Sequence, residues 1–193
     1  MRTAYIGMGG NLASWAGAPE QTLAAAVQRM ERLGRVAGRS SLYSTEPVGY
    51  AAQPRFVNAV AAVETGLTPR ELLHGLLAIE QEFGRDRSAG IANGPRTLDL
   101  DLLLLGDLEV SEPDLAIPHP RLAERAFVLT PLNEIAAEVV VPGVGKSVGE
   151  LLASLRAGGL GAADAVVRVE SEGWAVSRIS KARPGVPVTM TNT

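Results

Sequence analysis

The run Gly94-Pro95-Arg96-Thr97-Leu98-Asp99-Leu100-Asp101 constrains the fold of this chain most, because four further leucines follow it without interruption. The pattern predicts a loop that continues as a buried strand. Side chains of a strand alternate between its two faces, so Asp99 and Asp101 are expected to project from the same face. The opposite face is expected to carry Leu98, Leu100, Leu102 and Leu104.

Two carboxylates that share one face repel each other unless a cation lies between them. A divalent metal ion with oxygen ligands is the natural partner, and Arg96 beside the pair suggests a ligand that carries phosphate. The alternative is a strand end whose acids simply face water. An arginine-rich segment before the pair and the run Pro118-His119-Pro120-Arg121 after it favour the site over this alternative.

Length, composition and net charge exclude several classes of protein. The 193 residues suit one domain, and 46% of them are hydrophobic, which is typical of a globular chain with a proper core. The net charge of −3 argues against a general nucleic-acid or membrane-surface binder. The absence of cysteine excludes disulfides, thiolate metal sites and a cysteine nucleophile.

The arginines are nevertheless clustered, at Arg85, Arg87 and Arg96 and again at Arg121 and Arg125. A locally basic cleft in an acidic protein suits a small anionic ligand. The chain begins directly with a strand-like run and shows neither a signal peptide nor an apolar stretch of membrane-spanning length. We therefore expect a cytoplasmic protein.

Hydrophobic periodicity and capping signals predict the remaining elements. Strands are expected at residues 4–9, 36–43, 56–64, 98–105 and 139–141, and helices at residues 19–33, 69–83, 127–134 and 148–155. Thr68 and Ser147 each precede a glutamate by three residues, which is the pattern of a capping box. Gly9-Gly10 is expected to form a tight turn.

Several single residues leave alternatives open. Asn58 lies inside an apolar strand, so its amide either pairs with backbone or reads the edge of a ligand. His119, held between two prolines, is well placed to contact a phosphate oxygen. His74 falls off the apolar stripe of its helix and is given no role, and spacing alone places Glu80 at the surface.

Two segments are expected to lie outside the rigid core. Glycines and small residues in 85–93 suit a lid that closes over a ligand. The core domain is expected to span residues 1–157, followed by an extension over 158–193. Within the extension, residues 166–169 and 174–179 could pair as a hairpin, and the last residues are expected to be flexible.

Taken together, the motifs resemble those of the 6-hydroxymethyl-7,8-dihydropterin pyrophosphokinase (HPPK) family over about residues 4–155. The run at 94–101 matches the family signature without a gap. Supporting matches are Tyr5-Ile6-Gly7-Met8-Gly9-Gly10-Asn11-Leu12, Tyr43-Ser44-Thr45-Glu46-Pro47, Phe56-Val57-Asn58 and the stretch from Pro118-His119 through Arg125 to Phe127.

The resemblance implies a ferredoxin-like α/β (α+β) fold with a mainly antiparallel sheet and helices packed on its faces. It also implies an ATP-dependent diphosphokinase of folate biosynthesis, which moves diphosphate from MgATP to the hydroxymethyl group of the pterin and leaves AMP. Two Mg²⁺ ions and ATP as co-substrate are expected. The expected partners are these small molecules, with no nucleic acid or membrane, and the protein is expected to be a monomer.

The resemblance also assigns roles to residues. The implied catalytic residues are Arg85, Arg96, Asp99 and Asp101, of which Asp99 and Asp101 would hold the metal ions. ATP would further contact Glu80, Arg87, His119, Arg121 and Arg125. The pterin would contact Thr45, Glu46, Pro47, Val48, Phe56, Asn58 and Phe127.

Overall fold

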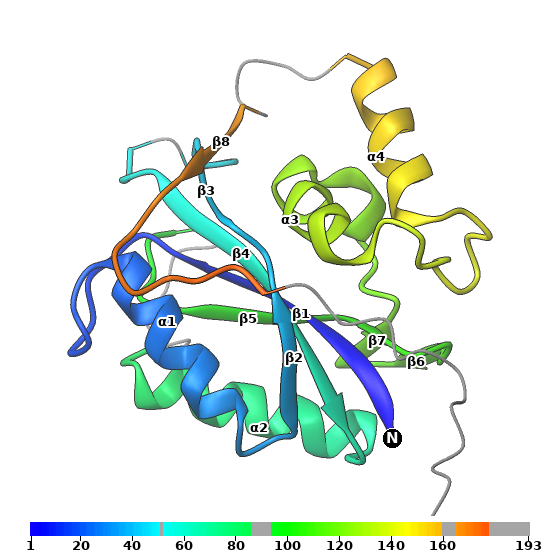
Figure 1. The fold of residues 1–193 in the computed structure, drawn as a ribbon, viewed down its shortest axis with the longest axis horizontal. Helices are drawn as coiled ribbons and strands as arrows, with labels where there is room; N and C mark the ends of the chain where they lie inside the picture. Colours follow the sequence, from blue (N-terminus) through cyan, green and yellow to red (C-terminus); the bar gives the residue numbers. More distant parts are fainter. Residues whose placement is uncertain (51, 86–93, 160–164, 178–193) are drawn as a thin grey trace, which may run out of the picture.

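A computed structural model describes residues 1–50, 52–85, 94–159 and 165–177 (Figure 1). Its strands are β1 (Arg2–Gly10), β2 (Arg35–Arg39), β3 (Leu42–Thr45), β4 (Phe56–Thr65), β5 (Asp99–Leu105), β6 (Val110–Glu112), β7 (Leu115–Ile117) and β8 (Val166–Val169). Its helices are α1 (Pro19–Met30), α2 (Pro69–Glu82), α3 (Ala126–Ala136) and α4 (Val148–Ala157), with a 3₁₀ turn at Leu122–Glu124.

The main sheet is antiparallel at every pairing among the described residues. Its order is β5-β1-β4-β3-β8, and β2 also pairs with β4 beyond the end of β3. Strands β6 and β7 form a separate two-stranded sheet. From β1 to β5 the elements follow the order β-α-β-β-β-α-β. Strands β2 and β3 pair with successive parts of β4, so when they are counted as one divided strand this order is the βαββαβ arrangement of ferredoxin-like folds. The expected fold class is therefore confirmed.

Helices α1 and α2 cover one face of the sheet (Figure 1). Alternation along β1 sends Ala4, Ile6 and Met8 toward these helices, where they join one continuous core cluster. The apolar stripes of α1 and α2 complete that cluster because residues three and four apart share a helix face.

Helices α3 and α4 pack over the opposite face, where they bury a second cluster that contains Tyr5, Val60 and Leu103. The residues that follow Tyr5 on this face of β1 are Gly7 and Gly9, and they line a pocket rather than the core. This face is therefore covered by helices at one end and hollowed at the other.

Two helices begin as their sequences predict. The Thr68 hydroxyl accepts from the Glu71 backbone N–H at 3.3 Å, and the Glu71 carboxylate accepts from the Thr68 N–H at 2.8 Å. Ser147 and Glu150 make the same reciprocal pair at the start of α4. Each box satisfies two backbone donors that the first helical turn leaves open.

The strand expected at 36–43 is wrong as a single element, because it divides into β2 and β3 at Ser40 and Ser41. The Ser40 N–H donates to the Val60 carbonyl at 2.9 Å, and the Val60 N–H donates to the Ser40 hydroxyl at 2.9 Å. The Ser41 N–H donates to a carboxylate oxygen of Glu134 at 2.8 Å. The Ser40 hydroxyl and the Glu134 carboxylate thus take the place of backbone acceptors in the sheet, and the chain bends at this point.

Other local expectations are also corrected. Gly10 lies in β1, not in a turn, and a Cβ there would meet the Thr97 carbonyl oxygen at 2.4 Å. In β5 the register shifts so that Leu103 is an extra residue, and Leu104 joins the cluster under α3 and α4 instead of the α1–α2 side. The expected strand at 139–141 is reduced to a single bridge between Val140 and Ser147.

The described part of the extension is incorporated into the main sheet. Strand β8 pairs antiparallel with β3, so the expected hairpin between 166–169 and 174–179 is wrong for the described residues. The division of the chain at residue 157 stays a prediction.

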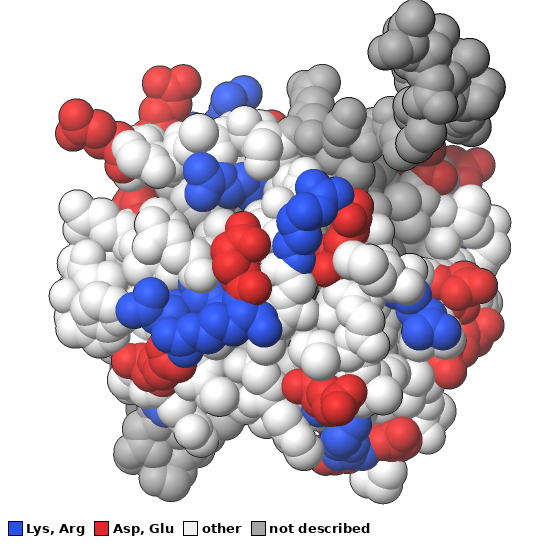
Figure 2. Space-filling view, turned by 60° about the horizontal axis from the view of Figure 1, so that its bottom comes forward, with Lys and Arg blue, Asp and Glu red and all other residues white. Residues whose placement is uncertain are grey.

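The molecular surface carries charges of both signs. Figure 2 shows basic and acidic side chains intermixed across the face in view, without a continuous basic surface. In the described part of the chain, no helix is long and apolar enough to cross a membrane.

The capping box at α2 yields a stability prediction. Thr68→Ala removes the hydroxyl that accepts from the Glu71 N–H. The free energy of unfolding is therefore expected to fall by about 1 kcal/mol. Urea denaturation measures the change. Ser154→Ala, at an exposed position of α4, is the control and is expected to change stability much less. Equal effects of both substitutions would contradict a contribution from the cap.

Candidate active site

One cross-strand row builds the floor of the pocket. In the antiparallel registers, Asp99 of β5 pairs with Gly9 of β1, Gly9 pairs with Asn58 of β4, and Asn58 pairs with Tyr43 of β3. Directly paired residues point to the same face of a sheet. A carboxylate and an amide therefore share one surface, separated only by a glycine that adds no side chain.

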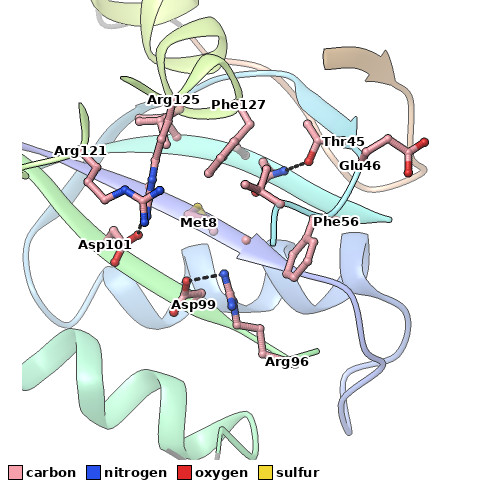
Figure 3. A pocket seen from close by; sticks show the side chains of 17 residues that line it. Met8, Thr45, Glu46, Phe56, Arg96, Asp99, Asp101, Arg121, Arg125 and Phe127 are labelled. Carbon is pink, nitrogen blue, oxygen red and sulfur yellow. Dashed lines mark hydrogen bonds and ion pairs between the residues drawn. The ribbon is translucent and has the colours of Figure 1, made fainter. Parts of the chain in front are cut away.

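The pocket lies above this row (Figure 3) and opens to solvent; together with its open mouth it spans about 790 Å³. Its lining includes many of the predicted site residues: Thr45, Glu46, Val48, Phe56, Asn58, Arg96, Asp99, Asp101, Arg121, Arg125 and Phe127. The structure thus gathers residues from β3, β4, β5, the segment before β5 and the start of α3 in one cavity.

Arginines surround the two carboxylates (Figure 3). Arg85 Nη2 lies 3.2 Å from Asp99 Oδ1, and Arg96 Nη2 lies 3.1 Å from Asp99 Oδ2. Arg125 Nη1 lies 3.8 Å from Asp101 Oδ2. The side chains are only partly exposed, so these pairs are screened less than pairs at an open surface.

Burial shifts the pKa values of both Asp101 and His119. Burial, reinforced by the negative charge of Asp99, raises the pKa of the Asp101 carboxyl, although His119 and Arg125 act in the opposite direction. Burial lowers the pKa of His119. Its Nδ1 accepts from the Arg121 backbone N–H at 3.1 Å, so the neutral ring presents its N–H at Nε2.

Two aromatic rings connect the charged and apolar parts of the pocket. The Arg96 guanidinium lies 4.8 Å from the centre of the Phe56 ring, and the Arg125 guanidinium lies 5.5 Å from the centre of the Phe127 ring. Both distances are within cation–π range. Each arginine is therefore held by a carboxylate at one side and by an aromatic face at the other.

Asn58 pairs with a side chain and not with the backbone partner considered from sequence, and its reading of a ligand edge stays a prediction. Its Nδ2 donates to the Thr45 hydroxyl at 2.8 Å, and both residues are buried. A Cβ on Gly9 would meet Asn58 Oδ1 at 2.8 Å, which shows that the amide oxygen lies over this glycine. The amide is thus oriented from two sides at the floor of the pocket.

Glu80 is buried, so the surface position expected from spacing is wrong. Its Oε1 accepts from the Leu100 N–H at 2.8 Å. Leu100 lies between Asp99 and Asp101, so Glu80 ties α2 to the part of β5 that carries the carboxylate pair. Helical periodicity missed this contact because it lies between two separate elements. His74 is exposed, as predicted.

Some predicted residues do not line the pocket itself. These are Pro47, Glu80, Arg85 and His119, although Arg85 reaches Asp99 directly. Arg87 and the rest of the expected lid, residues 86–93, lie outside the described residues.

Three residues of the site were not predicted from the sequence. Gly7 and Gly9 form the floor of the pocket, and Asn11 links two loops beside it. Asn11 donates to Gln53 Oε1 and to the Pro54 carbonyl, each at 3.0 Å, while its own Oδ1 accepts from the Arg96 N–H at 2.8 Å. It thereby joins the loop before β4 to the segment before β5. The signal in the sequence was that Asn11, a polar residue, directly follows a strand that ends in two glycines.

Comparisons with known proteins show the family to which the chain belongs. The model of the family described as 7,8-dihydro-6-hydroxymethylpterin-pyrophosphokinase (HPPK) matches residues 5–137. A 2-amino-4-hydroxy-6-hydroxymethyldihydropteridine pyrophosphokinase of Pseudomonas aeruginosa is 45% identical over 152 residues, which cover 78% of this chain and 90% of the relative. The Haemophilus influenzae enzyme of the same name is 43% identical over 144 residues, covering 74% and 86%.

A solved structure of Plasmodium falciparum HPPK-DHPS supports the fold. It superposes with a TM-score of 0.62 at 15% identity and covers 79% of this chain. The chain spans 44% of that longer protein.

The family model and the relatives show that this chain is a pyrophosphokinase, an enzyme of folate synthesis. Within that class, it belongs to the HPPK family.

The raised pKa of Asp101 predicts a pH-dependent stability change. At any pH above the pKa that the Asp101 carboxyl has in the unfolded chain, ionisation of this carboxyl destabilises the fold. Asp101→Asn is therefore expected to increase the free energy of unfolding at pH 7 without Mg²⁺. The gain is expected to shrink as the pH falls and to disappear by about pH 3, below the pKa of about 3.9 that an Asp carboxyl has in the unfolded chain. Urea unfolding across this pH range measures it.

Asp107→Asn, at an exposed turn, is the matched control and is expected to show no such gain. A lower stability of Asp101→Asn at pH 7 would mean that pairing with Arg125 outweighs burial.

Proposed function

We propose that this pocket transfers diphosphate from MgATP to the hydroxymethyl oxygen of 6-hydroxymethyl-7,8-dihydropterin, giving AMP and the pterin diphosphate. The observation that carries the proposal is the cross-strand row of Asp99, Gly9 and Asn58. It gives one continuous floor with a charged end for phosphates and an amide end for a flat heterocycle.

The carboxylate pair suits divalent metal ions. Asp99 and Asp101 lie on one face of β5, and crowding of like charge at Asp101 favours a bound cation. Among the described residues no cluster of three or more acidic, histidine or cysteine side chains could hold a metal. The remaining ligands would be water and phosphate oxygens, as is usual for Mg²⁺. Two bound Mg²⁺ ions would neutralise phosphate charge and help to activate the attacking hydroxyl.

The arginines supply the rest of the charge neutralisation that phosphoryl-type transfer requires. Arg85 and Arg96 both reach Asp99, and they can exchange this partner for phosphate oxygens. Within the described part of the chain, the buried Nε of Arg96 has no hydrogen-bond partner. Such an atom is costly without a ligand, which supports a phosphate contact here.

His119, Arg121 and Arg125 would complete the ATP end. The Nε2–H of neutral His119 can donate to a phosphate oxygen, and the two arginines add positive charge on the α3 side of the pocket. Arg87 stays a prediction as a further ATP contact. For Glu80 we propose a positioning role, because it holds the Leu100 amide between the carboxylates.

The other half of the pocket suits a pterin. Phe56 and Phe127 offer apolar ring faces, and Asn58 with Thr45 offers a hydrogen-bonding edge. Glu46 and Val48 extend the lining, while Pro47 would shape the loop between them. Arg96 and Arg125 each contact one of the rings, so both arginines lie where the two halves meet.

The expected monomer stays a prediction.

Phosphorus NMR tests the proposed reaction on purified protein with Mg²⁺, ATP and the hydroxymethyl dihydropterin. The expected products are AMP and a pterin diphosphate, and Asp101→Asn is expected to abolish turnover while keeping its fold. Asp107→Asn serves as the control and is expected to retain activity. Formation of ADP would identify a different kinase reaction, and full activity of Asp101→Asn would remove that residue from the metal site.

The glycine floor gives a second prediction. In Gly9→Ala the new Cβ would lie 2.8 Å from Asn58 Oδ1, so the amide must move from its position beside Thr45. KM for the pterin is expected to rise about tenfold or more, equivalent to about 1.4 kcal/mol of lost binding, with KM for ATP little changed. Steady-state kinetics measures both constants.

Gly66→Ala is the control, since a Cβ at Gly66 meets no atom within 4 Å. An unchanged pterin KM in Gly9→Ala would show that the Asn58 orientation is unimportant for binding.

A further inference from the structure

The segment from Val166 to Ser177, here called the C-terminal brace, lies against the strand that borders the pterin half of the pocket. Strand β8 pairs along the whole of β3, with Val166 opposite Thr45 and Val169 opposite Leu42. Figure 1 shows β8 beside β3 at the margin of the sheet. The HPPK family model ends at residue 137, so the brace lies outside the part of the chain that it matches.

Trp174 attaches the brace to the point where β2 and β3 separate. Its Nε1 donates to the Ser40 carbonyl at 2.9 Å, and its ring packs against the core cluster on the α1–α2 side. The Arg39 guanidinium lies 4.9 Å from the centre of the indole ring. The backbones of Arg39 and Ser177 exchange two hydrogen bonds, at 2.7 and 3.1 Å. An indole with both polar and aromatic contacts is a firm anchor.

Strand β3 in turn orients the residues proposed to bind the pterin. It ends at Thr45, whose hydroxyl holds the Asn58 amide at 2.8 Å. The next residues, Glu46 and Val48, line the pocket. β3 has only four residues, and β4 is its only other strand partner in the described sheet. So short a strand at a sheet edge is weakly held, and pairing with β8 removes it from the edge.

Strand β3 and the residue before it also contact α3, the helix of the opposite wall. The Glu134 carboxylate of α3 accepts from the Ser41 N–H at 2.8 Å, the Ser41 hydroxyl at 2.9 Å and the Tyr43 hydroxyl at 3.0 Å. Helix α3 carries Phe127 at its start. A displacement of β3 would therefore reach both the amide edge and the aromatic face.

We propose that the C-terminal brace is a positioning element for pterin binding, with Trp174 as its anchor. This inference rests on the proposed function of the pocket. The carboxylates lie on β5, at the far end of the strand order from β8. Loss of the anchor should therefore weaken the pterin half selectively, whereas a general loss of stability would affect both substrates.

The test measures binding and kinetics on the full-length chain. In Trp174→Ala we expect the dissociation constant of the pterin, measured by calorimetry with Mg²⁺ and a non-hydrolysable ATP analogue, to rise about tenfold. We expect the same rise in KM for the pterin, with KM for ATP and kcat at saturating pterin within about twofold of wild type. Trp174→Phe keeps a ring under Arg39 and is expected to recover most of the affinity.

Val176→Ala, at an exposed position in the brace, is the matched control and is expected to bind as the wild type does. If Trp174→Ala does not fold, Arg39→Gln removes the guanidinium stacking and the side-chain bond to the Ala175 carbonyl without emptying the indole site. Unchanged pterin affinity in the folded variant, or an equal rise for both substrates, would overturn the inference. Wild-type protein that releases no AMP would instead overturn the proposed reaction.

Discussion

Strand β1 lies between β5 and β4, and its hydrogen bonds to both strands set the register on which the pocket depends. That register brings Asp99, Gly9 and Asn58 into one row, although they are far apart in the sequence. A shift of one residue would turn the carboxylates or the amide into the α1–α2 core. The extensive burial of the β1 and β4 side chains on that side makes such a shift costly.

The pocket concentrates groups that would be unfavourable alone. Asp99 and Asp101 repel each other, and burial disfavours the charge of Asp101, while ion pairs with Arg85, Arg96 and Arg125 compensate. The same arginines are the groups that polyphosphate would recruit. Under the proposed function, this arrangement of charges would receive a highly charged co-substrate, and the glycine floor would leave room for it.

Several features were predictable because they depend on neighbouring residues. The capping boxes at Thr68 and Ser147, the buried β5 and the common face of Asp99 and Asp101 follow from spacing alone. Errors arose where a distant partner decides the local structure. Hydrogen bonds with Glu134 and Val60 interrupt the strand at Ser40 and Ser41. Strand β8 pairs with β3 instead of forming a local hairpin.

Residue types and their spacing indicate the chemistry: a carboxylate pair on one strand face, arginines on both sides of it, an amide in an apolar strand, and motifs that resemble one family. How these groups combine depends on the folded chain. It put Gly9 between carboxylate and amide, buried Glu80 against the Leu100 N–H and laid the brace along β3. The reason is physical, since periodicity records which face a side chain occupies, whereas pairing across strands and contacts between helices depend on the packing of the entire chain.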